Sequence, residues 1–180
     1  MAKKIESRSK WILFIVVLTF VISFLLSLVS ELIIPNANMF LCVFLVLFFI
    51  FLGIIFDIIG VAITTAEPKM FHSMASQKVS GAKIAIKLIN KKDKASSFCN
   101  DVIGDICGVV SGSCGLSIAI KMANLFNVNS LYLILFMTAI ISTLTIGGKA
   151  IGKGVAVRKS NDILYEISKL LSVFEGKSNK

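Results

Sequence analysis

MFLCVFLVLFFIFLGIIFDIIGVAITT, residues 39–65, is an almost unbroken apolar run in which Asp57 is the one charged side chain. About 20 apolar residues of helix suffice to cross a bilayer, so this stretch is long enough to span a membrane. An acidic side chain at the centre of a spanning helix costs roughly 2.5 to 3.5 kcal/mol. Asp57 therefore needs a polar partner or an ion inside the protein.

The composition of the whole chain places this segment in an integral membrane protein. Of 180 residues, 56% are hydrophobic and 16% are charged, and the mean hydropathy is +0.89. The pattern predicts an all-α polytopic membrane protein with about four spans, at residues 11–34, 39–65, 97–125 and 131–147. A cleaved signal peptide is the rival interpretation of the first segment. Its apolar stretch exceeds an ordinary signal core and no A-x-A site follows, which favours a retained span.

Basic residues lie almost entirely on one side of these spans. Four precede the first span, seven lie between Lys69 and Lys94, and seven follow from Lys149 onward; the remaining one is Lys121. By the positive-inside rule we expect both termini to be cytoplasmic in a multi-pass plasma-membrane protein. The net charge of +9 follows this orientation, so anionic lipid headgroups are the expected partner, and no nucleic acid is expected.

Two further segments show amphipathic helical spacing outside the spans. The spacing of apolar residues over 66–94 predicts a juxtamembrane helical hairpin at the cytoplasmic surface, bent at 79–81. The spacing over 158–175 predicts a C-terminal surface helix. We therefore divide the chain into an N-terminal segment with an additional span, 1–36, a main membrane domain, 37–176, and a frayed tail, 177–180.

The third predicted span carries two more aspartates on one helical stripe. At 100° per residue, Asp101 and Asp105 share a face with Gly104, Gly108 and Gly112. Glycines four residues apart let another helix approach closely, so a helix-packing role is expected for all three.

The depths of the acidic residues suggest a common chamber. Asp57 lies eight residues before Thr65, roughly 12 Å of helix from the inner end of its span. We expect Asp57, Asp101 and Asp105 to meet there, with Lys149 as a charge partner. The further contributors expected are Thr64, Thr65, Ser111, Gly147 and Gly148. Hard oxygen ligands of this kind suit Mg²⁺ or Na⁺. The alternative is a purely structural ion-pair network.

Nothing in the sequence predicts an enzyme or an organic cofactor. Cys42, Cys99, Cys107 and Cys114 have no C-x-x-C spacing and are interpreted as buried thiols. His72, the sole histidine, lies in the basic segment and is expected at the surface. No arrangement of nucleophile, base and orienting group is visible.

Three motifs resemble the transmembrane domain of CNNM (cyclin M) and CorC-type magnesium transporters, over about residues 40–174. Ala62-Ile63-Thr64-Thr65-Ala66 with the segment 81–88 resembles the family's stretch after a core span. The segment NDVIGDI, 100–106, takes the place of its G-N-N-L-V-N motif, and GKAIGK, 148–153, resembles its G-E-x-x-P-K motif.

The resemblance implies a homodimer with three core spans, a juxtamembrane hairpin and a Mg²⁺ site used for export, coupled to Na⁺. In this chain Lys149 stands at the family's glutamate and Gly152 at its proline, which redistributes charge. The chain ends before the family's CBS modules, so we expect no ATP-linked gating of the family type. Two main hypotheses follow: a divalent-cation transporter, or a non-transporting subunit that binds a larger transporter or regulatory partner. A third, a lipid-binding protein, rests on the basic amphipathic helices alone.

Overall fold

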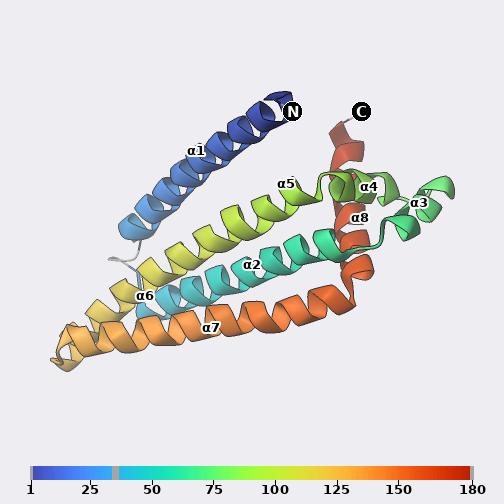
Figure 1. The fold of residues 1–180 in the computed structure, drawn as a ribbon. Helices are drawn as coiled ribbons and strands as arrows, with labels where there is room; N and C mark the ends of the chain where they lie inside the picture. Colours follow the sequence, from blue (N-terminus) through green and yellow to red (C-terminus); the bar gives the residue numbers. More distant parts are fainter. Residues whose placement is uncertain (1, 34–36, 179–180) are drawn as a thin grey trace. The chain divides into compact units, whose positions relative to one another are not determined.

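The computed structural model describes residues 2–33 and 37–178, and these residues form helices without any strand. The elements, shown in Figure 1, are α1 (Ala2–Ile33), α2 (Met39–Thr65), α3 (Pro68–Ser76), α4 (Ala82–Asn90), α5 (Lys92–Ser97), the π-helix η2 (Phe98–Gly104), α6 (Asp105–Phe126), α7 (Ser130–Arg158) and α8 (Ser160–Ser178). The predicted turn at 34–36 and the last two residues lie outside the described part of the chain.

Four helical segments of this described chain are long and apolar enough to cross a membrane. They are Trp11–Val29, Met39–Thr65, Lys92–Phe126 and Ser130–Arg158. The expected all-α class is thereby confirmed, and four helices have the length and apolar composition expected for the predicted spans. The predicted helix end at Gly147 is wrong, because α7 continues unbroken to Arg158. A helical glycine costs only about 1 kcal/mol relative to alanine, which is too little to stop a helix that tertiary contacts support.

The chain forms two compact units, one of Met1–Gly53 with Val102–Gly148 and one of Ile54–Asp101 with Lys149–Lys180. Within the first unit, α1 contacts α6. A Cβ atom placed on Gly53 of α2 would lie 3.1 Å from the Cβ of Cys107 and 3.3 Å from the carbonyl oxygen of Gly104. The absence of a side chain at Gly53 therefore permits close helix packing in this unit.

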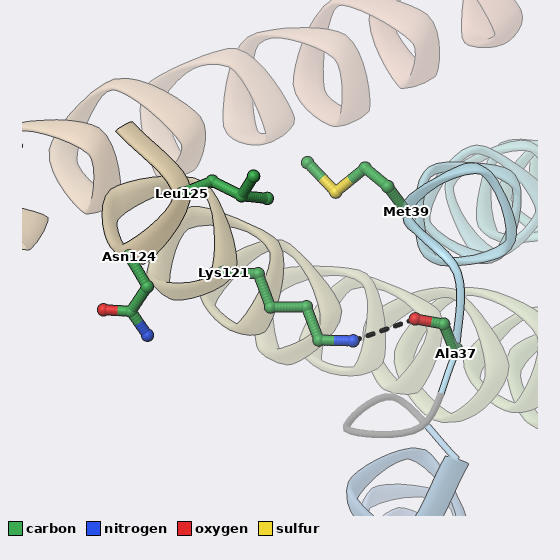
Figure 2. Close-up of a pocket in the computed structure, with 5 residues that line it drawn as sticks. All are labelled: Ala37, Met39, Lys121, Asn124 and Leu125. Carbon is green, nitrogen blue, oxygen red and sulfur yellow. Dashed lines mark hydrogen bonds between the residues drawn. The ribbon is translucent and has the colours of Figure 1, made fainter. Parts of the chain in front are cut away.

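Lys121 joins α6 to the segment that precedes α2 in the same unit. Its Nζ donates a hydrogen bond of 2.9 Å to the carbonyl oxygen of Ala37, as Figure 2 shows. Met39, Asn124 and Leu125 complete the lining of the surrounding pocket (Figure 2). The long lysine stem thus carries the ammonium away from the apolar surface of α6, and its hydrogen bond to Ala37 links α6 to the segment before α2.

The second unit is organised around α3, α4 and α8. Helix α4 packs against both α3 and α8, and Figure 1 shows α8 crossing α4. Phe71, Ala85 and Leu164, one from each helix, are fully buried in a shared core. Burial of a side chain the size of Phe71 contributes about 2 kcal/mol, so this core holds the three helices together.

Gly81 fixes the turn between α3 and α4 against α8. It has a left-handed φ of 84°, and a Cβ atom there would lie 2.8 to 2.9 Å from backbone atoms of Ser168 and Lys169. The Ser80 and Ser172 hydroxyls share a hydrogen bond of 3.1 Å beside it. Both the backbone conformation and the contact therefore require glycine at this turn.

We expect Gly81→Ala to destabilise the protein by about 2 kcal/mol, because the new methyl group strains a left-handed residue and meets immobile backbone. Gly154→Ala is the matched control, since a Cβ there meets no described atom within 4 Å. Thermal unfolding of both variants in detergent, followed by circular dichroism, measures the difference. Equal melting temperatures for the two variants would contradict this account of the turn.

Candidate functional site

Asp57 of α2 is buried, and its charge is met by Lys153 of α7. The exposed fraction of the residue is 4%, and the Lys153 Nζ lies 3.5 Å from Asp57 Oδ2. Both residues belong to the second unit. The contact is an ion pair without a hydrogen bond, because Oδ2 has no hydrogen-bond partner among the described residues. The carboxylate is therefore neutralised but incompletely solvated.

Gly152 allows α7 to come close to α2 at this level. A Cβ atom on Gly152 would lie 2.8 to 2.9 Å from side-chain carbons of Ile58 and 3.4 Å from Ile54. A larger residue would require the Ile58 side chain or the helix itself to shift. The glycine at this position therefore helps to bring the neighbouring Lys153 within reach of Asp57.

Asn100 provides a second buried oxygen in the same unit. Its Oδ1 is buried and has no hydrogen-bond partner in the described structure. The Asn100 side chain lies directly against Gly60, where a Cβ atom would collide with it. Gly60 follows Asp57 by three residues on α2, so both lie on one side of that helix. An amide oxygen and a carboxylate oxygen, each without a donor, are thus presented along one face of α2.

The π-helix η2 carries Asn100 and Asp101. A π-helix has a wider turn than an α-helix and occurs frequently at functional sites. Asp101 is exposed and its Oδ2 accepts a hydrogen bond of 2.7 Å from the Ser97 hydroxyl. In this turn the asparagine oxygen is therefore buried, while the adjacent aspartate is exposed and already bonded.

The other residues predicted for the site have different surroundings. Asp105 is exposed and begins α6 in the first unit, to which Gly148 also belongs. The hydroxyls of Thr64 and Thr65 are exposed and donate to the carbonyl oxygen of Val61. No group of three or more His, Cys, Asp or Glu side chains within residues 2–33 and 37–178 is placed to hold a metal ion. The chamber of three aspartates stays a prediction, as does the role of Lys149 in it.

Sequence reasoning missed three participants, namely Lys153, Asn100 and Gly60. Each had a signal. Lys153 follows Lys149 by one helical turn and so lies on the same face. Asn100 is an amide within a spanning segment, and Gly60 follows Asp57 at helical spacing. These signals were not decisive, because the choice between two lysines one turn apart depends on how far α7 extends and where α2 meets it.

The cysteines and the histidine lie outside this arrangement of side chains. Cys42, Cys107 and Cys114 are buried and Cys99 is partly buried. His72 is exposed on α3. The buried side-chain atoms without hydrogen-bond partners around Asp57 and Asn100 are therefore oxygen atoms, and proteins use oxygen ligands for hard cations rather than for thiophilic metals.

Comparisons of this chain with protein-family models, with curated proteins and with solved structures find no match. The resemblance to CNNM and CorC-type transporters stays a prediction from the sequence.

We expect Gly60→Ala to destabilise the protein by about 2 kcal/mol, because the methyl group overlaps the Asn100 side chain. In an Asn100→Ala background the same change should cost much less, so a double-mutant cycle measures the contact. Gly147→Ala is the control, since a Cβ there meets no atom of the described chain within 4 Å. Detergent-solubilised variants compared by thermal unfolding give the values. A cost for Gly60→Ala that is unchanged by Asn100→Ala would show that the two residues do not touch.

Proposed function

We propose that this chain is a multi-pass membrane protein that binds and transports a small hard cation, with the Asp57 carboxylate as its principal ligand. The observation that carries the proposal is the burial of Asp57, 4% exposed, in a membrane-length helix. The proposal includes a plasma-membrane location with both termini cytoplasmic, which the distribution of basic residues supports.

The unsatisfied oxygens support a role beyond structure. A buried ion pair contributes to stability only when its remaining lone pairs are also hydrogen-bonded. Asp57 Oδ2 and Asn100 Oδ1 are buried and lack hydrogen-bond partners among the described residues. A cation without hydrogens to donate interacts well with such oxygens, and water molecules complete its coordination.

The resemblance to the CNNM and CorC-type proteins supports Mg²⁺ export coupled to Na⁺ as the form of transport. Hard oxygen ligands are compatible with either ion. Asp101 and Asp105 then serve as secondary acidic groups along the path, and Lys149 as a nearby positive charge. A homodimer is the assembly that the same resemblance supports.

A flux measurement tests the transport proposal. We expect liposomes with the purified wild-type protein to show cation flux, measured with a Mg²⁺ indicator and with radioactive sodium in separate vesicles. Asp57→Asn should reduce the flux at least about tenfold, because removing a ligand charge weakens electrostatic stabilisation of the ion. Asp162→Asn on the exposed face of α8 is the matched control. Equal flux through wild type and Asp57→Asn would exclude the Asp57 site.

A second candidate function is that of an interaction subunit, and the glycine face of α6 favours it. Cβ atoms placed on Gly108 and Gly112 would meet no described atom within 4 Å. Both glycines line a groove of about 210 Å³, together with Thr138, Ile141, Ser142, Thr145 and Ile146. Open glycines on a spanning helix suit close approach of another helix, either from a second copy or from a larger transporter.

If this face packs against a second copy, Gly108→Leu combined with Gly112→Leu should abolish self-association, because the side chains separate the helices. Energy transfer between fluorescently labelled chains in liposomes measures association. Gly154→Leu on α7 is the control, since that position is equally open. Persistent energy transfer in the double variant would exclude Gly108 and Gly112 from a homodimer interface.

A further inference from the structure

The charges at the candidate site bear on which class of cation it accepts. Among residues 37–173, Asp57 is the one buried residue with a charged side chain. Its partner differs sharply in environment, since the Lys153 side chain is 54% exposed and that of Asp57 is 5% exposed. One member of the pair is thus held inside the protein, while the other reaches in from the surface.

We infer that Lys153 is a tethered counter-cation, which leaves Asp57 when a monovalent cation of the Na⁺ class enters. The inference rests on the proposed function and assigns the Asp57 site to Na⁺, the coupling ion of that function, rather than to the exported Mg²⁺. Exchanging an ammonium for Na⁺ replaces one positive charge with another beside a single buried carboxylate. The net charge of the buried group stays at zero.

A divalent cation fits this exchange less well. Mg²⁺ beside the Asp57 carboxylate leaves an additional positive charge in a low-dielectric setting, where an uncompensated charge is strongly disfavoured. Mg²⁺ also holds its water shell tightly and requires near-octahedral coordination. The two buried oxygens identified, Asp57 Oδ2 and Asn100 Oδ1, offer one full negative charge in total. The arrangement therefore selects by charge as well as by ligand type.

The position of Lys153 allows its ammonium to leave. The residue lies five positions before the end of α7 at Arg158, roughly 7.5 Å of helix from that end. Its neighbours in sequence, Gly152 and Gly154, have no side chains to crowd its stem. A lysine stem is long and flexible, so a change of rotamer suffices to carry the ammonium away from Asp57 and toward the end of α7. No movement of a helix is required.

Chemical labelling of Lys153 tests the exchange directly. The full-length protein in detergent is treated briefly with an amine-acetylating reagent, and peptides are quantified by mass spectrometry. The salts compared at equal ionic strength are NaCl, MgCl₂ and N-methylglucamine chloride. We expect Na⁺ to raise the acetylation rate of Lys153 about tenfold over N-methylglucamine, because an ammonium held by a carboxylate is protected. Mg²⁺ should have little effect. Lys83, exposed on α4, is the internal control and should react equally in all salts.

Binding measurements with variants complete the test. Lys153→Met should bind radioactive sodium about tenfold more tightly than wild type, because the competing positive charge is gone. Lys153→Arg keeps a competitor and should not show this gain. Asp57→Asn should abolish sodium binding and leave Lys153 reactive in every salt. Circular dichroism and gel filtration establish folding, and the wild-type labelling result decides the question if Lys153→Met does not fold.

The outcomes separate this inference from the function on which it rests. Release of Lys153 by Mg²⁺ as effectively as by Na⁺, or no change in its reactivity with Na⁺, would overturn the exchange while leaving Asp57-dependent flux intact. Absence of flux and of binding for both ions in the folded wild type would instead overturn the proposed transport function. Sodium binding that is unaltered in folded Lys153→Met also contradicts the role of Lys153.

Discussion

The low polarity of the membrane interior is the constraint on which this structure depends. Every backbone group in a spanning segment must find its hydrogen bond within the segment, so the chain crosses as helices. The same medium penalises Asp57, which the protein retains in a helix that is otherwise apolar. The ion pair with Lys153 and the close approach of α7 at Gly152 both concern how that one charge is accommodated.

Three glycines take different parts in this arrangement. Gly60 makes room for the Asn100 side chain and Gly152 for two isoleucines of α2, so both permit contacts around the candidate site. Gly81 has a different purpose, since its left-handed backbone and its contact with α8 close the bundle of α3, α4 and α8. The glycines of α6 at 108 and 112 remain open within the described chain, which makes them more relevant to a partner helix than to the fold of this chain.

Much of the architecture could be predicted, because the hydropathy of a spanning helix is a property of about twenty residues together and does not depend on any single one. The run 39–65 became α2 with the same bounds, and the break at 79–81 contains the turn at Gly81. The end of α7 could not be predicted in the same way. Gly147 and Gly148 suggested a stop, but their propensity cost is small compared with the contacts that α7 makes further along. The π-helix at 98–104 also has no simple pattern, because its extra residue per turn is tolerated only through tertiary packing.

The sequence by itself determined the number of membrane-length apolar helices and the presence of acidic groups within them, since both follow from composition and periodicity along the chain. It also singled out Asp57, together with Asp101 and Asp105, as acidic residues that need an explanation. Only the tertiary structure decided that Lys153 reaches this carboxylate and that the Asn100 oxygen is buried beside Gly60. Such pairings depend on the distances between helices. A single methyl group at a contact such as Gly60 or Gly152 can change these distances, and the residues that set them are far apart in the chain.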